Sequence, residues 1–279
     1  MSVVTRIEPR RPSWRTVARE LIAYRDLLRV LVRRDFVAVY KQTVLGPAWY
    51  VLQPLATTVV FTLIFGRVAA LGTDGAPDFL FYMAGSVLWS WAQASFTNIS
   101  NALTVHAHLL SKVYFPRLVL PIAAGIAALA QLALNVFLLL LSIAWVRGPG
   151  GAALPASGRA WGPLAAVVLA GVTVFGAGLW VASLTAKYRD LKFGLPFLIQ
   201  LWMFLSPVVW PLSRVPATYR PWLALNPLVM PFELWRRGWL GVGTWDGRLL
   251  IANLALACGL LASGLWLFRR VEGTLADVV

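Results

Sequence analysis

Few side chains of this sequence are of the types that perform catalytic chemistry, and they occur without a recognisable catalytic spacing. Of its 279 residues, two are histidines, His106 and His108, and one is a cysteine, Cys258. A lone His-x-His pair chelates metal poorly without further ligands, so we predict loop residues near a helix end and no metal site. The sequence also has no Gly-x-x-x-x-Gly-Lys-Ser/Thr loop to cradle the phosphates of ATP.

The composition places the chain in a membrane. Hydrophobic residues make up 59% of it and charged residues 13%, whereas a soluble domain has about 45–50% and about 25%. The net charge of +14 would suggest nucleic acid in a soluble protein. Here the charges separate long apolar runs, so they are better explained as signals for orientation in a bilayer. We therefore expect membrane lipids, and no nucleic acid, as partners.

Six apolar runs predict an all-α integral membrane protein with six transmembrane helices. Each uncharged run holds 20 residues or more, and a helix needs about 20 to cross the hydrocarbon of a bilayer. Only a helix lets such a run satisfy its own backbone hydrogen bonds there. The centres of the spans carry no charge, which argues against an ion-coupled carrier. The predicted spans are 49–71, 79–101, 118–146, 163–185, 194–212 and 249–268.

The basic residues predict the orientation of these spans. With the N-terminus inside, the inner segments hold 17 of the 25 Lys and Arg residues, and positive residues concentrate on the cytoplasmic side. Both ends of the chain are then cytoplasmic. We divide the chain into a cytoplasmic N-terminal segment (1–48), a transmembrane domain (49–268) and a cytoplasmic tail (269–279).

Residues 14–36 predict an amphipathic helix. Apolar residues recur from Trp14 to Leu31 with spacings of three and four, and the arginines lie off that stripe. The basic polar face favours a position along the inner membrane surface. An ordinary cytoplasmic helix packed on a partner is the alternative.

The connection 213–248 predicts two short re-entrant helices between the fifth and sixth spans. Its uncharged run, 221–232, has 12 residues, and a length of about 10–14 indicates a re-entrant or interfacial segment. Proline at positions 221, 227 and 231 favours a break at Asn226-Pro227. A surface loop with a tryptophan-rich belt is the alternative.

Aromatic side chains are denser in the first and fifth spans than membrane anchoring needs. Flat rings offer apolar faces and lose little side-chain entropy, so together they would suit a long ligand, such as a sugar chain, that slides without a fixed site. Anchoring at the interface and core packing are the alternatives for each ring taken singly. The rings are those of Trp49, Tyr50, Phe61, Phe65, Phe193, Phe197, Trp202, Phe204 and Trp210.

An ordered set of motifs resembles one family of transporters. YKQTVLGPAW and QPL open the first span, KVYFPR follows the second, AKYRDLKFGLPFLIQ, SPVVWPLSRVP and LNPL surround the fifth, and FRRVEGTLADVV ends the chain. In this order they resemble the membrane subunit of ABC-2 type exporters of cell-surface polysaccharides, the permeases for O-antigen, capsule and teichoic acid. The resemblance covers residues 25–279, nearly the whole chain.

The resemblance implies a permease subunit that is not itself an enzyme and binds no cofactor. Two copies would form a channel, and two separate ATPase subunits would bind ATP and Mg²⁺ beneath it, which accounts for the missing phosphate loop. The cargo would be a glycan on a polyprenyl pyrophosphate, exported across the bacterial inner membrane. The sequence leaves open whether that glycan is O-antigen, capsule or teichoic acid.

The resemblance also assigns roles to residues. The basic stretch before the first span would meet the lipid pyrophosphate, although anchoring to the inner surface explains it equally well. The loop after the second span would couple to the ATPase, with a plain turn as the alternative, and the re-entrant segment would form an outer gate. The channel residues are Tyr40, Trp49, Phe61, Phe65, Phe197, Trp202, Phe204 and Trp210; the pyrophosphate residues are Arg33, Arg34 and Lys41; the coupling residues are Ser111, Lys112, Val113, Tyr114, Phe115, Pro116 and Arg117; and the gate residues are Pro221, Trp222, Asn226, Pro227, Glu233 and Arg236.

The competing interpretation is a membrane-embedded enzyme of lipid-linked glycan metabolism, such as a sugar transferase or a phosphatase. Such an enzyme would need carboxylates or histidines clustered at the membrane surface. The outer connections offer Asp74, Asp78, Glu233 and Asp246, but these four have no recognisable catalytic spacing.

Overall fold

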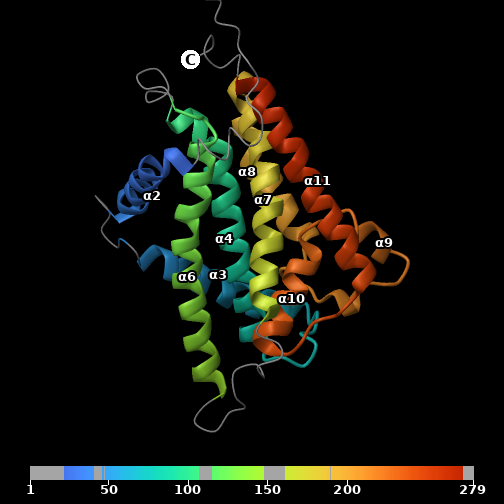
Figure 1. Cartoon of the computed structure of the whole chain (residues 1–279). Coiled ribbons are helices and arrows are strands. Elements are labelled where there is room, and N and C mark those ends of the chain that lie inside the picture. Colours follow the sequence, from blue (N-terminus) through green and yellow to red (C-terminus); the bar gives the residue numbers. More distant parts are fainter. Residues whose placement is uncertain are drawn as a thin grey trace, which may run out of the picture.

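The structure, a computed structural model, is helical in the part of the chain that it describes, which confirms the all-α class (Figure 1). It describes residues 22–40, 46, 48–106, 115–147, 161–188 and 190–272. The elements are α2 (Arg25–Tyr40), α3 (Ala48–Phe61), the π-helix η1 (Thr62–Val68), α4 (Asp78–Val105), α6 (Val119–Arg147), α7 (Trp161–Lys187), α8 (Leu191–Leu205), the 3-10 helix η3 (Leu212–Arg214), α9 (Arg220–Leu223), α10 (Val229–Leu240) and α11 (Gly247–Glu272).

Four helical stretches of the described part are long and apolar enough to cross a membrane. They are Ala48–Val68, which joins α3 to η1, then Val119–Val146, Trp161–Lys187 and Gly247–Glu272. These stretches coincide with the first, third, fourth and sixth predicted spans. The second predicted span corresponds to α4, which has 28 residues but carries more polar side chains.

The fifth predicted span, 194–212, is wrong in its extent. Its helix α8 ends at Leu205 after 15 residues, which is about 22 Å of helix against about 30 Å of hydrocarbon. Ser206 has extended backbone, with φ −99° and ψ 149°, because the ring of a following proline disfavours helical geometry. The chain then turns through 207–211 into η3.

The predicted amphipathic helix 14–36 lies partly outside the described residues, and within them α2 continues past it to Tyr40. The helix packs against α6 (Figure 1). Leu31 is buried there, and Leu28 and Val32 are half-buried beside it. The apolar stripe therefore covers part of this chain's own bundle.

α4 lies at the centre of the bundle. It contacts α6, α7, α3 and α10, and most of its side chains from Leu80 to Leu103 are buried. In Figure 1, α4, α6, α7 and α11 run alongside one another, with the carboxyl ends of α4 and α11 at the same end of the molecule. This inner helix fixes the spacing of the elements around it.

α7 and α11 pack closely where two glycines face each other. A Cβ added to Gly176 would lie 2.5 Å from the backbone nitrogen of Leu261, and one added to Gly264 would collide with the carbonyl oxygen of Gly176. Small residues let helix backbones approach in this way inside membranes. The contact therefore depends on the absence of side chains.

We predict that Gly264→Ala lowers the melting temperature of the detergent-solubilised protein, because the added methyl group must push α11 away from α7. Gly259→Ala is the matched control on the same helix, since a Cβ there meets nothing within 4 Å. That control should be neutral or slightly stabilising, because alanine favours a helix over glycine by about 0.5–1 kcal/mol. Equal melting curves for the two variants would contradict the packing described here.

Candidate functional site

Among the described helices, α8 and α3 each bury only two residues and present exposed apolar side chains. On α8, Phe193 is 89% exposed and Phe197 is 62% exposed, whereas Leu195 and Ile199 are buried against the core. On α3, Trp49 is also exposed. Large apolar patches of this kind mark contact with lipid or with another protein surface.

The predicted channel aromatics fall into two groups. Those on the open surface are Trp49, Phe197 and Phe204. The others are half-buried and pack against the core of the chain. Phe61 and Phe65 form a T-shaped pair with centroids 5.5 Å apart, Trp202 meets Phe96 edge to face at 5.6 Å, and the Trp210 indole donates to the carbonyl of Phe204 at 3.0 Å. The side chain of Tyr40 lies outside the described part.

Asn226 holds the break between α9 and α10 in place. Its Oδ1 accepts from the Trp202 indole at 3.1 Å and from the backbone nitrogen of Leu228 at 3.1 Å. Its Nδ2 donates to the Leu205 carbonyl at 2.9 Å and to the Ser206 hydroxyl at 3.0 Å. One amide thus satisfies groups at the end of α8 and at the start of the next turn. Of its neighbours in the predicted gate, Pro227 is buried, whereas Pro221 and Trp222 are exposed.

A second asparagine, which the sequence analysis missed, acts on the same segment from α11. The Oδ1 of Asn253 accepts from the backbone nitrogen of Met230 at 2.9 Å, and its Nδ2 donates to the Ala224 carbonyl at 3.3 Å. Asn253 is fully buried. Its presence inside an otherwise apolar run was the signal that could have singled it out, because a buried amide requires partners.

Glu233 and Arg236 of the predicted gate form a buried clamp. Their side chains lie 3.8 Å apart and are each 1% exposed. Arg236 donates to the Val208 carbonyl at 2.6 Å, and its guanidinium lies 3.8 Å from the centroid of the Phe81 ring. Glu233 accepts from the backbone nitrogens of Leu212 at 3.4 Å and Thr244 at 2.6 Å. The pair therefore ties α10 to the segments on both sides of it, and its role in a gate stays a prediction.

At the opposite end of the bundle, Phe115 anchors the segment that follows α4. Its side chain is buried in an apolar cluster with Leu31 of α2, Leu103 of α4 and Phe268 of α11. Pro116 beside it is partly exposed. The remaining predicted coupling residues before Phe115, which are Ser111, Lys112, Val113 and Tyr114, lie outside the described residues.

Polar contacts flank the same segment on both sides. Arg117 donates from its backbone nitrogen to the Glu272 carboxylate at 3.2 Å, and from its guanidinium to the Glu272 carbonyl. On the other side of the loop, Arg34 pairs with Asp35 at 2.9 Å and with His106, the last described residue before the loop. The chain on each side of the predicted coupling loop is thus bonded to another element, to α11 or to α2.

The predicted pyrophosphate residues are only partly described. Arg33 is exposed on α2, Arg34 is engaged with Asp35 and His106, and Lys41 lies outside the described residues.

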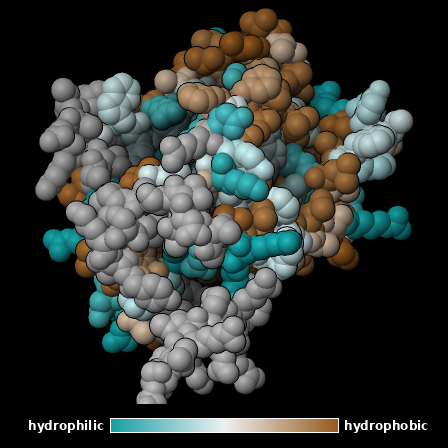
Figure 2. All heavy atoms as spheres, turned by 90° about the horizontal axis from the view of Figure 1, so that it is seen from above, coloured by the Kyte–Doolittle hydropathy of each residue, from teal (hydrophilic) through white to brown (hydrophobic). Residues whose placement is uncertain are grey.

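Seen from the end of the molecule where α11 terminates, hydrophilic residues lie among apolar ones, and apolar residues gather along one edge (Figure 2). His108 also lies outside the described part, and no group of three possible metal ligands occurs within it.

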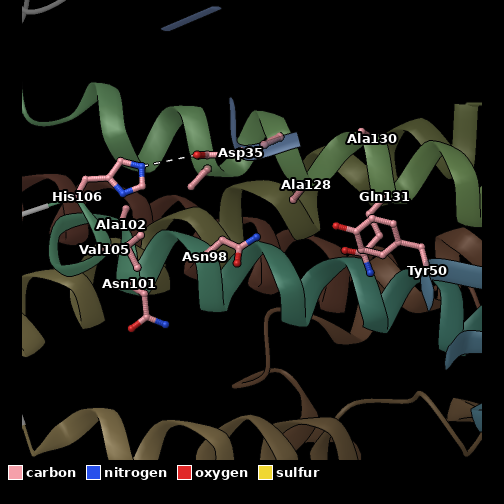
Figure 3. A pocket seen from close by; sticks show the side chains of 12 residues that line it. Asp35, Tyr50, Asn98, Asn101, Ala102, Val105, His106, Ala128, Ala130 and Gln131 are labelled. Carbon is pink, nitrogen blue, oxygen red and sulfur yellow. Dashed lines mark ion pairs between the residues drawn. The ribbon is translucent and has the colours of Figure 1, made fainter. Parts of the chain in front are cut away.

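A cavity of about 350 Å³ lies between α2, α4 and α6, bordered by Tyr50 of α3. Tyr50 and Gln131 lie toward one end of it and His106 and Asp35 toward the other, with Asn98 between them (Figure 3). One wall consists of alanines of α6. The sequence analysis did not predict this cavity, because no run of residues brings these three helices together.

The comparisons with known proteins agree with this arrangement. The family model described as ABC-2 type transporter matches residues 26–239. The chain belongs to the ABC-2 type transporter family. Among its relatives, an O-antigen export system permease protein RfbA of Myxococcus xanthus is 30% identical over 264 residues, which cover 92% of this chain and 97% of that protein. Two RfbA proteins of Klebsiella pneumoniae are each 25% identical over 91% of this ABC-2 type chain and 95% of their own length.

We predict that Arg236→Met destabilises this ABC-2 type protein strongly, because it leaves the Glu233 carboxylate buried without its ion pair, a loss that costs about 3–5 kcal/mol in comparable sites. Arg237→Met is the matched control on the next residue, where the arginine is only partly buried beside Trp245. Thermal unfolding in detergent and the yield of monodisperse protein measure the difference. A stable Arg236→Met protein would show that the clamp is dispensable.

Proposed function

We propose that this chain is the membrane subunit of an ABC exporter that moves a lipid-linked polysaccharide of the O-antigen class across the inner membrane. The observation that carries the proposal is the similarity to O-antigen export permeases over 92% of this chain and 97% of the Myxococcus relative. The alignment therefore includes most of the predicted transmembrane domain. The cargo would be a glycan on polyprenyl pyrophosphate.

The proposed working unit is a homodimer in which each chain crosses the membrane six times. α4 and α8 would supply the two crossings beyond the four long apolar stretches, with 206–214 and α10 completing the short α8 on the outer side. The exposed apolar faces of α3 and α8 support the proposal of a dimer, because in a dimer these faces would line or close a channel shared by the two copies. Trp49, Phe197 and Phe204 would then lie along the glycan's path.

Energy would come from two separate ATPase subunits that hold ATP and Mg²⁺. They would bind at the end of the bundle where α4 and α11 terminate, which the proposed orientation places in the cytoplasm together with both ends of the chain. The segment around Phe115 and Arg117 would receive their movement. Its contacts to α2 and α11 support this role, since a push there displaces whole helices rather than a free loop.

An enzyme of lipid-linked glycan metabolism finds less support. The carboxylate of Glu233 is buried and bonded to Arg236, Leu212 and Thr244. Asp78 accepts a hydrogen bond from the Thr73 hydroxyl at 3.1 Å, and Asp246 accepts from the first residues of α11. These carboxylates are therefore engaged in hydrogen bonds or an ion pair that stabilise the local structure.

The proposed function is tested in proteoliposomes that contain this chain and an ABC ATPase that co-purifies with it from the source cells. ATP hydrolysis should rise several-fold when a lipid-linked glycan is added and should not respond to the same glycan freed from its lipid. Labelled glycan should reach the opposite side of the vesicle only with ATP. If the chain alone chemically altered the glycan without nucleotide, the enzyme alternative would replace the proposal.

The coupling role predicts that Arg117→Ala lowers the glycan exported per ATP hydrolysed, because the segment loses the guanidinium bond to the Glu272 carbonyl while the ATPase still turns over. Arg270→Ala is the control at the same end of α11, where the arginine lies over the ring of Trp266. The same proteoliposomes measure both rates. An unchanged ratio of export to hydrolysis in Arg117→Ala would show that the contact transmits nothing.

A further inference from the structure

The cavity between α2, α4 and α6 presents neutral polar groups to its interior. Asn98 and Gln131 contribute amides and Tyr50 contributes an aromatic ring with a hydroxyl. Within the described part of the chain, the amides of Asn98 and Gln131 make no hydrogen bond or other polar contact. Each amide both donates and accepts hydrogen bonds, which is what a ligand rich in hydroxyl groups needs.

The shape of the cavity suits a small ring. Ala124, Ala127, Ala128 and Gln131 follow one face of α6, so three methyl groups form a low wall beside one amide. A volume of about 350 Å³ falls within the range of small-molecule sites, about 300–1,000 Å³. The aromatic face of Tyr50 provides an apolar surface of the kind that sugar rings pack against.

The charges around the cavity are paired. Asp35 is bonded to Arg34 at 2.9 Å, and His106 lies beside both, with its Nε2 3.8 Å from the Asp35 carboxylate. An anion placed inside would face this carboxylate without a cation of its own. The cavity itself therefore favours a neutral ligand.

An apolar groove of about 370 Å³ adjoins the cavity between α2 and α6. The two share Ala127 and Ala130, and the groove is lined by Leu28, Val32 and Ile126 together with the carbon chains of Arg29 and Arg33. Arg29 is paired with Asp26 at 3.1 Å, whereas Arg33 makes no ion pair within the described residues. The groove thus offers an apolar floor with one available guanidinium at its rim.

We propose that the cavity binds the sugar nearest the lipid in the transported glycolipid, with the prenyl chain in the adjoining groove and the phosphates at Arg33. The apolar groove, the guanidinium of Arg33 that borders it and the neutral polar cavity that shares Ala127 and Ala130 with it offer the three kinds of surface that a prenyl chain, its phosphates and a sugar require. The inference rests on the proposed function and adds a site that reads the head of the cargo. The sliding surface on α3 and α8 would then begin where this site ends.

The test compares two kinds of probe on the full-length chain in nanodiscs. One is geranylgeranyl pyrophosphate, and the other is the same lipid carrying a single glucose, galactose, mannose or N-acetylglucosamine. At least one glycosylated lipid should bind roughly tenfold more tightly than the bare lipid, since two neutral hydrogen bonds contribute about that factor. The double variant Asn98→Leu/Gln131→Leu should lose this preference and keep its affinity for the bare lipid.

A second variant tests the position of the site. Ala127→Phe fills the wall shared by cavity and groove, so it should weaken the binding of both lipids. Ala133→Phe is the matched control, because Ala133 lies on the same helix, is exposed and lines neither hollow. The folding of each variant is checked by its melting curve.

The outcomes separate the inference from the function on which it rests. Equal binding of bare and glycosylated lipids to the unaltered chain, or a sugar preference that survives the double variant, would overturn the cavity as a sugar site and leave the exporter standing. Unchanged lipid binding by the Ala127→Phe variant would also overturn the cavity as a sugar site and leave the exporter standing. Failure of every prenyl lipid to bind would instead overturn the proposed cargo, and the inference with it.

Discussion

The rest of the structure depends on the need to satisfy backbone polar groups where helices break. The core of a bilayer supplies no water, so a chain that turns there must satisfy its amides and carbonyls internally. Asn226 and Asn253 do this for the end of α8 and for the step from α9 to α10. Glu233 and Arg236 likewise form hydrogen bonds with backbone groups of the segments on either side of α10. The short helices α9 and α10 are therefore held in one position against the bundle.

The parts of the fold that follow from local physics could be predicted from the sequence. Long uncharged runs place α6, α7 and α11 within a few residues, because length and hydrophobicity alone decide such helices. The end of α8 was missed because 206–212 is as apolar as the helix before it, and only Pro207 marks the break. The charged members of the predicted gate were found as residues, but their burial depends on Phe81 and Val208, which are distant in sequence. The cavity could not be predicted from any local sequence pattern, since it forms only where α2 packs against α6.

The two ends of the bundle have separate apolar cores joined by the same helices. One cluster contains Leu31, Phe115 and Phe268, while the larger one runs past Tyr82 and Trp235 to the clamp. α4 and α7 contribute to both. Packed interiors deform little, so helices shared by two clusters tend to move as rods. In the proposed exporter, these helices would connect the segment around Arg117 to the clamp around Arg236 without a flexible linker.

A transporter of long polymers has to reconcile recognition with movement. A site that grips every sugar unit would halt the chain, because each step would cost the hydrogen bonds formed in the previous one. In the proposed channel, aromatic faces such as those of Trp49 and Phe197 would avoid this, since apolar contact has no strong directional preference. Selective binding must then occur at a site that contacts only one unit of the polymer during transport. In a lipid-linked glycan, the lipid-proximal sugar is the one unit with a fixed position relative to the membrane anchor. The proposed site in the polar cavity beside α2 would bind this unit before the rest of the glycan reaches the aromatic surface.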